Sequence, residues 1–399
     1  MRRGAFITHL VFSGVIFTFA ASIATASPPE TLKIGSPAPD FKLPGVDGKT
    51  YTLDSFRDAE ILVIVFTCDH CPTAQAYEDR IKRLAANYKD KSVALVAISP
   101  NDPDAVRLDE MGYTDLGDSL EDMKIRAKDH DFNFPYLFDG ADQKVALAYG
   151  PAATPHAFVF DRSRKLRFVG RIDNSDDPRR ATTHETRDAI EALLAGKPVP
   201  VEQTKTFGCS IKWTEKRDSA RKSADAWAKE PVSLKTIDEK GIKALVGNDG
   251  DKLRLVNVWA TWCGPCVEEL PELVKINHMY RRRRFELVTI SADSPDERDQ
   301  ALKMLKEKEV SAINYLFDGD DKYKLMDALD EKSTGALPHT LLVAPGGKVI
   351  YRKSGPIEPL ELKKAIVGYL GRTYADDAPK RLPKADPDSR RETGAKVNR

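Results

Sequence analysis

The stretch LRLVNVWATWCGPC, residues 253–266, joins a run of strand-forming apolar residues directly to two cysteines separated by two residues. A second Cys-x-x-Cys pair, Cys68 and Cys71, follows a similar apolar run at residues 61–66. A helix-like pattern comes after each pair. A helix N-terminus lowers the pKa of a nearby thiol, which would make the first cysteine of each pair a nucleophile. The context therefore favours redox-active dithiols over zinc ligands or structural disulfides.

Both halves of the chain repeat the same order of elements. The pentapeptide Tyr-Leu-Phe-Asp-Gly occurs at residues 136–140 and 315–319, and a Pro-His pair follows each copy at residues 155–156 and 338–339. We interpret this order as two homologous α/β modules, each with a central mixed sheet flanked by helices. The predicted strands are 61–66, 93–98, 157–160 and 166–171 in the first module and 253–259, 285–290, 340–343 and 349–353 in the second, with long helices at 74–88 and 267–280.

The module boundaries follow from composition. We expect the first module at residues 32–207 and the second at 228–372, joined by a connector at 208–227 that contains Cys209. The first module is longer between its cysteines and its pentapeptide, and the extra residues fall in the polar segment 101–130. The final stretch, 373–399, is polar and interrupted by prolines, so we expect it to be disordered.

The N-terminus predicts export. Arg2 and Arg3 precede an apolar stretch, and the small residues at 24–26 form a cleavage site, so residues 1–26 are interpreted as a signal peptide. A retained anchor is the alternative, because the apolar stretch is long for a cleaved signal. The expected location is periplasmic or otherwise extracytoplasmic, in a bacterium, with no integral membrane domain after cleavage. The 62 basic and 61 acidic residues nearly balance, and nothing indicates a nucleic-acid partner.

The segment WATWCGPC, residues 259–266, resembles the active-site segment of the thioredoxin fold, and the wider segment is similar to exported reductases of the TlpA/ResA type. The resemblance implies a thioredoxin-like fold for both modules. It also implies that Cys263 is the exposed attacking thiolate and that Cys266 is the thiol that resolves the mixed disulfide. Trp262 would cover the disulfide and shield it from solvent.

Two more residues are assigned through this resemblance. Asn257 stands where thioredoxins carry a buried acid, whereas Glu269 occupies the place of the TlpA/ResA-type acid, from which a carboxylate could accept the proton of Cys266. An ordinary exposed helix glutamate is the alternative. Pro338 matches the cis-proline that lies opposite the cysteines and holds the backbone of Leu337 against a substrate chain, the alternative being a trans proline at a strand start.

The first module departs from this pattern. Its segment VFTCDHCP, residues 65–72, has no tryptophan, and no obvious carboxylate serves its second thiol. His70, just before Cys71, resembles part of the dipeptide between the cysteines of oxidising DsbA-like proteins. An imidazole there would stabilise the Cys68 thiolate, whereas Asp69 would oppose that effect. The net effect of His70 and Asp69 on the pKa of Cys68 stays open. Pro155 is the candidate cis-proline of this module.

Other functions of the first module remain open. The opening GSPAPDF, residues 35–41, resembles the start of an AhpC/TSA (peroxiredoxin-like) domain, which raises thiol peroxidase activity as an alternative. The segment around Cys68, however, does not match the peroxiredoxin pattern Pro-x-x-x-Thr-x-x-Cys. The module could also be a non-catalytic binding domain, or handle copper in the manner of exported copper chaperones built on this fold. The copper ligands would be Cys68, Cys71, His70 and His156.

Cys209 is the odd cysteine. In a connector flexible enough to approach Cys68, it either resolves the disulfide of the first module, relays electrons between modules, or is an inert thiol. The predicted function is exchange of disulfides with exported protein substrates, with the second module acting as a reductase. The resemblance implies a membrane thiol reductant as partner. We expect no cofactor and no resident metal.

Overall fold

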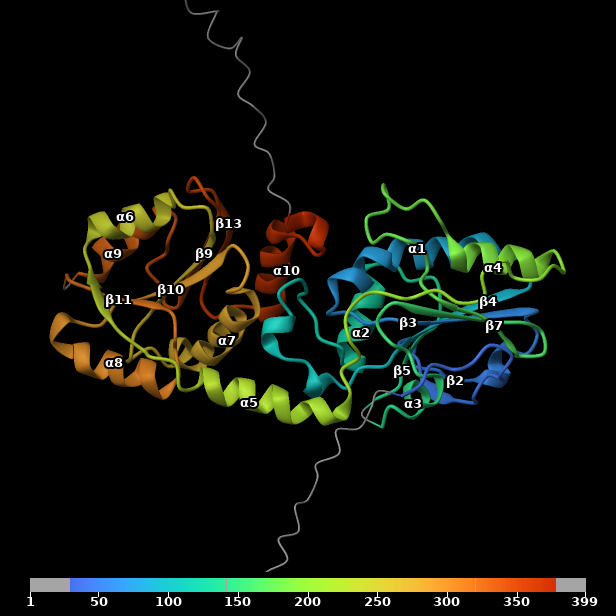
Figure 1. Cartoon of the computed structure of the whole chain (residues 1–399). Coiled ribbons are helices and arrows are strands. Elements are labelled where there is room, and N and C mark those ends of the chain that lie inside the picture. Colours follow the sequence, from blue (N-terminus) through green and yellow to red (C-terminus); the bar gives the residue numbers. More distant parts are fainter. Residues whose placement is uncertain (1–28, 141, 320, 378–399) are drawn as a thin grey trace, which may run out of the picture.

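The computed structural model describes residues 29–140, 142–319 and 321–377. It contains two α/β units side by side, joined by a helix that begins at the edge of the first unit and runs along the second (Figure 1). The predicted signal peptide and residues 378–399 of the predicted tail lie outside the described residues. Within the described part, no helix is long and apolar enough to cross a bilayer.

The first unit is built on a five-stranded mixed sheet in the order β5-β4-β3-β6-β7. Strands β3, β4 and β5 run parallel, whereas β6 and β7 are antiparallel to their neighbours. The strands are β3 (Ile61–Phe66), β4 (Val93–Ser99), β5 (Tyr136–Phe138), β6 (His156–Phe160) and β7 (Leu166–Gly170). The helices are α1 (Pro72–Tyr88), α2 (Leu120–Asp129), α3 (Lys144–Tyr149) and α4 (Glu185–Leu194).

Alternating side chains of the fully buried strand β3 serve two cores. Ile61, Val63 and Val65 pack with α1, α2 and α4 on one face of the sheet. Leu62, Ile64 and Phe66 pack on the other face with α3 and the N-terminal hairpin of β1 (Lys42–Pro44) and β2 (Thr50–Thr52). Because both faces are covered, the strand is a continuous apolar run in the sequence.

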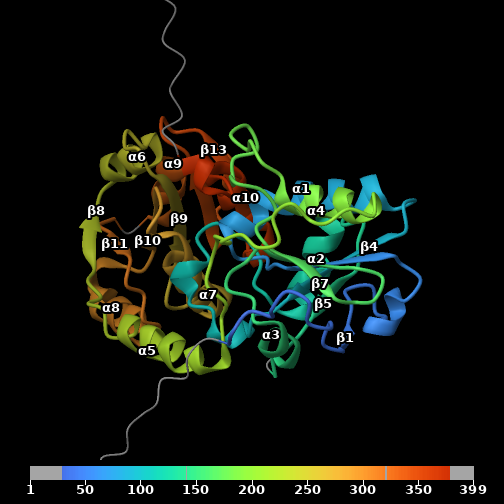
Figure 2. The same ribbon diagram turned by 45° about the vertical axis from the view of Figure 1, so that its right-hand side comes forward.

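The second unit repeats this order as β11-β10-β9-β12-β13 and adds β8 at the outer edge of the sheet (Figure 2). Its strands are β8 (Lys235–Ile237), β9 (Leu253–Trp259), β10 (Phe285–Ser291), β11 (Ile313–Phe317), β12 (His339–Val343) and β13 (Val349–Ser354). The helices are α6 (Glu239–Gly247), α7 (Gly264–Tyr280), α8 (Arg298–Glu307), α9 (Lys322–Leu329) and α10 (Pro359–Leu370). Helices α7, α8 and α10 cover one face, and α6 and α9 cover the other. The predicted class of two α/β units with mixed, helix-flanked sheets is confirmed.

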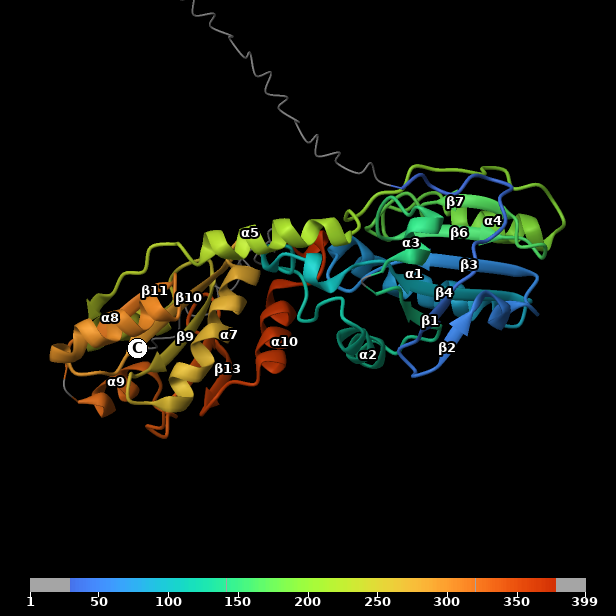
Figure 3. The same ribbon diagram turned by 90° about the horizontal axis from the view of Figure 1, so that it is seen from below.

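The longer segment of the first unit lies between the two units. It contains the short 3-10 turns η2 (Pro103–Ala105) and η3 (Leu108–Glu110), and it lies beside α10 in Figures 1 and 3. Its Leu108 and Met111 pack against the core of the second unit. Across the same boundary, the hydroxyl of Tyr280 donates a hydrogen bond to the carbonyl oxygen of Thr114 at 2.7 Å. We refer to residues 101–119 as the bridging segment.

The connector is ordered and divided between the units. Residues 209–212 pack on the first unit: Ile211 is buried, and the amide of Lys212 donates to Asn101 Oδ1 at 2.9 Å. Helix α5 (Arg217–Trp227) then reaches the second unit, where Trp227 stacks on His278 with ring centroids 4.6 Å apart. The predicted boundary at residue 207 therefore left out a segment that belongs with the first unit.

The predicted start of the tail is also wrong. Residues 374–377 form a 3-10 turn, η6 (Tyr374–Asp377), and the amide of Thr373 donates to Asp376 Oδ2 at 2.8 Å. The ring of Tyr374 packs edge-on against Tyr113 of the bridging segment, 5.1 Å between centroids. Contact with the other unit, which composition does not reveal, orders these residues.

Candidate active site

The second cysteine pair lies where β9 ends and α7 begins. Cys263 is the N-cap residue of α7, Pro265 stands in the first turn, and Cys263 and Cys266 are joined in a disulfide. Cys266 is fully buried and Cys263 is 7% exposed, so the sulfur that a substrate can reach belongs to Cys263. This is the geometry expected for an attacking cysteine followed by a buried resolving cysteine.

The predicted cis-proline is present beside this pair. The Leu337–Pro338 peptide bond is cis. The next residue, His339, is the first of β12 and pairs with Val258 near the end of β9. Pro338 therefore lies at the same end of the sheet as the disulfide, and the trans alternative is wrong.

A buried carboxyl lies one helical turn after the second cysteine. Glu269 accepts hydrogen bonds from Asn257 Nδ2 at 2.8 Å and from the amide of Ile357 at 3.0 Å. Burial raises its pKa, although both hydrogen bonds act in the opposite direction. Asn257, at the position expected for a thioredoxin acid, thus binds the acid supplied by the helix. The alternative of an exposed glutamate is wrong, since Glu269 is 7% exposed.

Trp262 extends into solvent. Its side chain is 56% exposed, and Lys322 Nζ lies 5.6 Å from its ring centroid. The disulfide is already packed within the apolar core that contains Ala260 and Leu270. That Trp262 covers the disulfide stays a prediction. An exposed ring beside a reactive sulfur offers an apolar surface to a substrate chain.

The first cysteine pair also lies between a strand and a helix, but its two thiols are not joined in a disulfide. Cys68 follows β3, Cys71 is the N-cap residue of α1, and both are free thiols. The Thr154–Pro155 bond is cis, as predicted. Cys68 Sγ lies 3.1 Å from the hydroxyl of Thr154, and Cys71 Sγ lies 3.6 Å from its carbonyl oxygen. The residue before the cis-proline therefore contacts both sulfurs.

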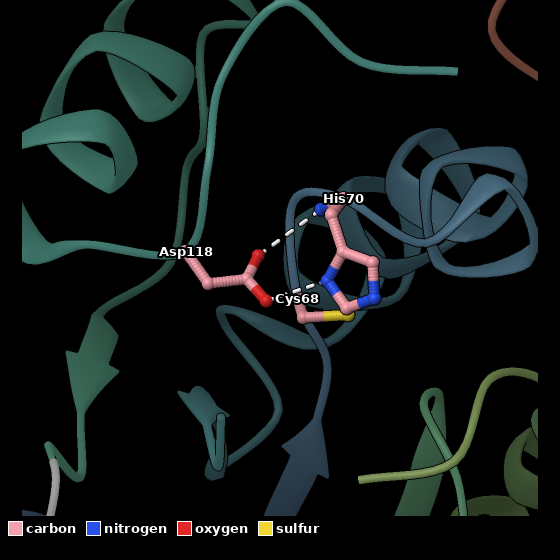
Figure 4. Close-up of side chains that lie close together, drawn as sticks. All are labelled: Cys68, His70 and Asp118. Atoms are coloured by element: carbon pink, nitrogen blue, oxygen red, sulfur yellow. Dashed lines mark hydrogen bonds and ion pairs between the residues drawn. The ribbon is translucent and has the colours of Figure 1, made fainter. Parts of the chain in front are cut away.

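An acid that the sequence analysis missed organises this site. Asp118, from the bridging segment, accepts hydrogen bonds from the amides of Asp69 and His70 at 2.9 and 3.0 Å. Its second oxygen lies 2.6 Å from His70 Nδ1, and Figure 4 shows this pair beside Cys68. The two side chains are almost completely buried. The only signal in the sequence was an acidic insertion of unusual length.

The His70–Asp118 pair is an ion pair shielded from water. Burial lowers the pKa of His70, but the charge of Asp118 outweighs it and raises that pKa. Burial likewise raises the pKa of Asp118, and the charge and hydrogen bonds of His70 outweigh it, so that this pKa is lowered. His70 Nε2 is buried without a hydrogen-bond partner among the described residues. The protonated form of His70, next to the two thiols, is therefore favoured.

This charge favours the thiolate of Cys71 and not that of Cys68. Burial, contact with Cys71 and the charge of Asp118 raise the pKa of Cys68. Burial opposes the Cys71 thiolate too, but hydrogen bonds from the Cys209 and Cys68 thiols, the charge of His70 and the amide of Ala74 outweigh it and lower its pKa. Cys71 is also the N-cap residue of α1, so the start of this helix acts on its thiolate as well; that Cys68 is the nucleophile of the pair stays a prediction.

Asp69 does not act as expected either. It is buried and accepts a hydrogen bond from the hydroxyl of Tyr136 at 2.9 Å. Burial, reinforced by the charge of Asp118, raises its pKa well above the usual range. Its neutral form is therefore favoured, and a neutral carboxyl does not repel a thiolate.

Cys209 belongs to this cluster of thiols. It packs against Cys68, Cys71 and Ala74, and its carbonyl oxygen accepts a hydrogen bond from the amide of Thr154 at 3.0 Å. Contact with Cys71 and burial raise the pKa of the Cys209 thiol. Its backbone is fixed by pairing with Thr154, so the predicted flexible approach to Cys68 is replaced by a fixed place beside Cys71.

The predicted set of four copper ligands is not assembled. The donor atoms that lie within 4.8 Å of one another belong to Cys68, His70 and Asp118, and they are the donors that a cation would find here. His156 is engaged elsewhere: its Nδ1 accepts a hydrogen bond from the amide of Ala152 at 3.1 Å, and burial lowers its pKa to about 4.

Comparison with known proteins identifies the family of both units. The sequence pattern of the AhpC/TSA family matches residues 34–169 and again 230–352, which together make up more than half of the chain. The chain belongs to the AhpC/TSA family. The repeated match is consistent with the duplicated order found in the sequence, and the predicted resemblance is confirmed.

The chain is similar to proteins whose names describe thiol–disulfide chemistry. The chain is 34% identical over 146 residues to the thiol:disulfide interchange protein CycY of Rhizobium leguminosarum bv. viciae, covering 36% of this chain and 68% of CycY. It is 26% identical over 149 residues to the thiol-disulfide oxidoreductase ResA of Bacillus cereus, covering 36% of this chain and 75% of ResA. The chain is thus a disulfide oxidoreductase of the AhpC/TSA family.

Solved structures resemble single units of the chain. A hypothetical protein from Sinorhizobium meliloti 1021 is 34% identical, with a TM-score of 0.42, over 46% of this chain and 97% of that protein. A putative thiol:disulfide interchange protein DsbE from Chlorobium tepidum is 20% identical, with a TM-score of 0.31, over 42% of this chain and 98% of that protein.

Proposed function

We propose that this protein reduces disulfide bonds of exported proteins, with Cys263 and Cys266 as its redox centre. The observation that carries the proposal is the bonded pair at the start of α7, with the carboxyl of Glu269 buried one helical turn behind it. A carboxylate in that place opposes negative charge on the thiols. It thereby favours the disulfide over the dithiol, which makes the dithiol a reductant.

The first step joins enzyme and substrate. In the dithiol form, the Cys263 thiolate attacks one sulfur of the substrate disulfide. A mixed disulfide forms and the other substrate sulfur leaves as a thiolate. The start of α7 stabilises the attacking thiolate, since Cys263 is the N-cap residue of this helix. Cys263 takes this role because Cys266 has no exposed surface.

The second step releases the substrate. Glu269 accepts the proton of Cys266, and the Cys266 thiolate then attacks the sulfur of Cys263. The Cys263–Cys266 disulfide forms again and the second substrate sulfur leaves as a thiolate. Burial raises the pKa of Glu269, and a carboxylate with a raised pKa is a stronger base. This property suits a group that accepts the proton of Cys266. An external dithiol must then reduce the disulfide to complete the cycle.

Substrate binding is assigned to the rim of this site. The backbone before Pro338 would hold an extended substrate chain, and the exposed ring of Trp262 would contact its apolar side chains. We assign catalysis of this reaction to the second unit, residues 228–372, and a separate thiol centre to the first, residues 32–212. Export through residues 1–26 would place the protein outside the cytoplasm, where a membrane thiol reductant would supply electrons.

Insulin reduction tests the proposal. The full-length protein, kept reduced by dithiothreitol, is expected to accelerate insulin precipitation, and Cys263→Ser is expected to abolish the acceleration. Cys68→Ser serves as the matched control, because it removes the corresponding cysteine of the other unit. Undiminished activity of Cys263→Ser would contradict the proposal, as would an equal loss in both variants.

A further inference from the structure

The three thiols of the first unit differ in their access to solvent. Cys68 is 2% exposed and Cys71 has no exposed surface. Cys209 is partly exposed, between the exposed residues Gly208 and Ser210. A disulfide that arrives from solvent therefore meets Cys209 before either residue of the Cys-x-x-Cys pair.

The position of Cys209 is set by its neighbours along the chain. Cys209 pairs with Thr154 as an isolated antiparallel bridge, next to the cis-proline of the first unit. Gly208 has a φ of +140°, and a Cβ added to it would lie 1.9 Å from the carbonyl oxygen of Thr154. A glycine is thus required for this close approach. The approach brings the next residue, Cys209, against Cys71.

Direct contact links the accessible sulfur to a buried one. The Cys209 and Cys68 thiols both lie within hydrogen-bond reach of Cys71 Sγ, at the start of α1. Cys71 is therefore the central sulfur of the three. It can form a disulfide with Cys68 on one side or with Cys209 on the other.

We propose that Cys209 is the receiving thiol of the first unit, and that Cys71 passes a disulfide between Cys209 and Cys68. The substrates are disulfides that reach the surface around Cys209, and the buried Cys68–Cys71 bond is the final store of the oxidising equivalent. The inference rests on the proposed thiol-exchange function, but it concerns a different centre from Cys263–Cys266.

Each step balances. The Cys71 thiolate takes the proton of Cys209, and the Cys209 thiolate attacks an incoming disulfide R–S–S–R, giving Cys209–S–S–R and R–S⁻. This thiolate takes the proton back from Cys71 and leaves as R–SH. The Cys71 thiolate attacks the sulfur of Cys209 and releases the second R–S⁻, leaving Cys71 and Cys209 joined. The Cys68 thiol then attacks Cys71, its proton moves to Cys209, and the Cys68–Cys71 bond forms.

The second unit borders this route. The hydroxyl of Tyr374, which follows α10, lies within hydrogen-bond reach of Cys209. Burial and the nearby sulfurs raise the pKa of Tyr374 to about 12. The side chain is 51% exposed and is held against Tyr113 of the bridging segment. A substrate that reaches Cys209 must therefore pass Tyr374.

Glutathione disulfide is a suitable probe, used on the full-length protein with Cys263→Ser and Cys266→Ser to silence the other centre. After acid quenching and alkylation, peptide mass spectrometry maps the products. With Cys71→Ser added, we expect glutathione to accumulate on Cys209, although more slowly, because the Cys71 thiolate is no longer there to take the proton of Cys209. With Cys68→Ser added, we expect a Cys71–Cys209 disulfide. With Cys209→Ser or Cys209→Ala added, loss of free Cys68 and Cys71 thiols is expected to slow at least about tenfold, because both sulfurs are buried.

The outcomes separate this inference from the proposed function. Glutathione on Cys68 in the Cys71→Ser protein, or an unchanged rate in both Cys209 variants, would overturn the inference. Absence of any reaction in the first unit would overturn it as well. None of these results affects insulin reduction by Cys263, which is measured in the protein with an intact second centre. Unchanged thermal unfolding of the Cys209 variants excludes misfolding as the cause of a slower reaction.

Discussion

At the scale of single residues, the pairing of Glu269 with Asn257 gives a buried carboxyl a chemical task. The carboxyl is kept in the core by two hydrogen bonds, and its pKa is raised by burial. We expect Glu269→Gln to slow resolution of the mixed disulfide by about 10²-fold, as for loss of a general base. Wild-type resolution should speed up as the pH rises through the raised pKa of Glu269, and the variant should lack this rise.

Stopped-flow measurement of substrate release from a preformed mixed disulfide, between pH 5 and 9, checks this expectation. Glu268→Gln is the matched control, since this neighbouring glutamate is exposed. A pH profile that is the same in Glu269→Gln and wild type would show that the carboxyl has no part in the proton transfer.

The His70–Asp118 pair makes a prediction about stability. Because the pKa of Asp118 is lowered in the fold, its carboxylate stabilises the fold above the ordinary aspartate pKa of about 3.9. This stabilisation is lost as the pH falls through the lowered pKa. The raised pKa of His70 stabilises the fold below the ordinary histidine pKa of about 6.5, and this is lost as the pH rises through the raised value. The pair therefore contributes most between about pH 4 and 6.5.

Asp118→Asn is expected to lower the free energy of unfolding by about 3–5 kcal/mol within that range, because it leaves a buried charge without its partner. The difference should shrink as the pH rises through the pKa of His70. Urea unfolding across pH 4 to 9 measures it. Asp104→Asn is the control, because this carboxyl is 76% exposed and its loss should cost less than about 1 kcal/mol. A pH-independent difference would argue against the ion pair.

At the scale of single residues, the sequence identified the members of the two sites better than it identified the side chains that surround them. The cysteines and Glu269 were found because they hold fixed places in or next to the Cys-x-x-Cys motif, and both cis-prolines because each opens a repeated Pro-His pair before a strand. Asp118 was missed, because its contact with His70 joins segments that are far apart in the chain. The surroundings of the first cysteine pair could not be predicted for the same reason: Cys209 packs against the pair and Asp118 binds the amide of Asp69, and neither is near Cys68 in sequence.

At the scale of elements, β3 and β9 have the predicted bounds, since both are buried on two faces and are continuous apolar runs. The bridging segment was recognised only as an insertion. Its place between the units depends on contacts such as Tyr280 with Thr114 and Arg372 with Asp115, which no periodic pattern encodes. Short 3-10 turns in a polar segment give no such pattern.

The bridging segment connects the second unit to the thiols of the first, and this can be tested at Arg372. This residue donates to Asp115 at 2.5 Å and lies two positions before Tyr374, the neighbour of Cys209. We expect Arg372→Ala to release Tyr374 and to increase alkylation of Cys209 by iodoacetamide severalfold, because access to the thiol controls this reaction.

Lys364→Ala is the control for that measurement. Lys364 forms an ion pair with Asp129 across the same boundary, but both side chains are partly exposed, so the pair is worth little. An equal rise in alkylation in both variants would indicate general loosening of the boundary. No rise in Arg372→Ala would contradict the role given to Tyr374.

At the scale of the whole molecule, one fold carries two unlike redox centres. The second unit has a bonded pair above a buried acid, whereas the first has three thiols next to a buried ion pair. A carboxylate one helical turn after Cys266 is expected to disfavour thiolates there, whereas His70, whose pKa is raised, favours the thiolate of Cys71. The same scaffold is therefore expected to hold a reducing pair in one unit and a more oxidising set in the other.

The reduction potential of the Cys263–Cys266 pair decides whether the second unit is a reductase. It is measured by equilibrating the full-length protein with glutathione buffers after Cys68, Cys71 and Cys209 have been changed to serine. For a reducing pair we expect a value near that of thioredoxin, about −270 mV. A value near that of a strong oxidant such as DsbA, about −120 mV, would contradict it.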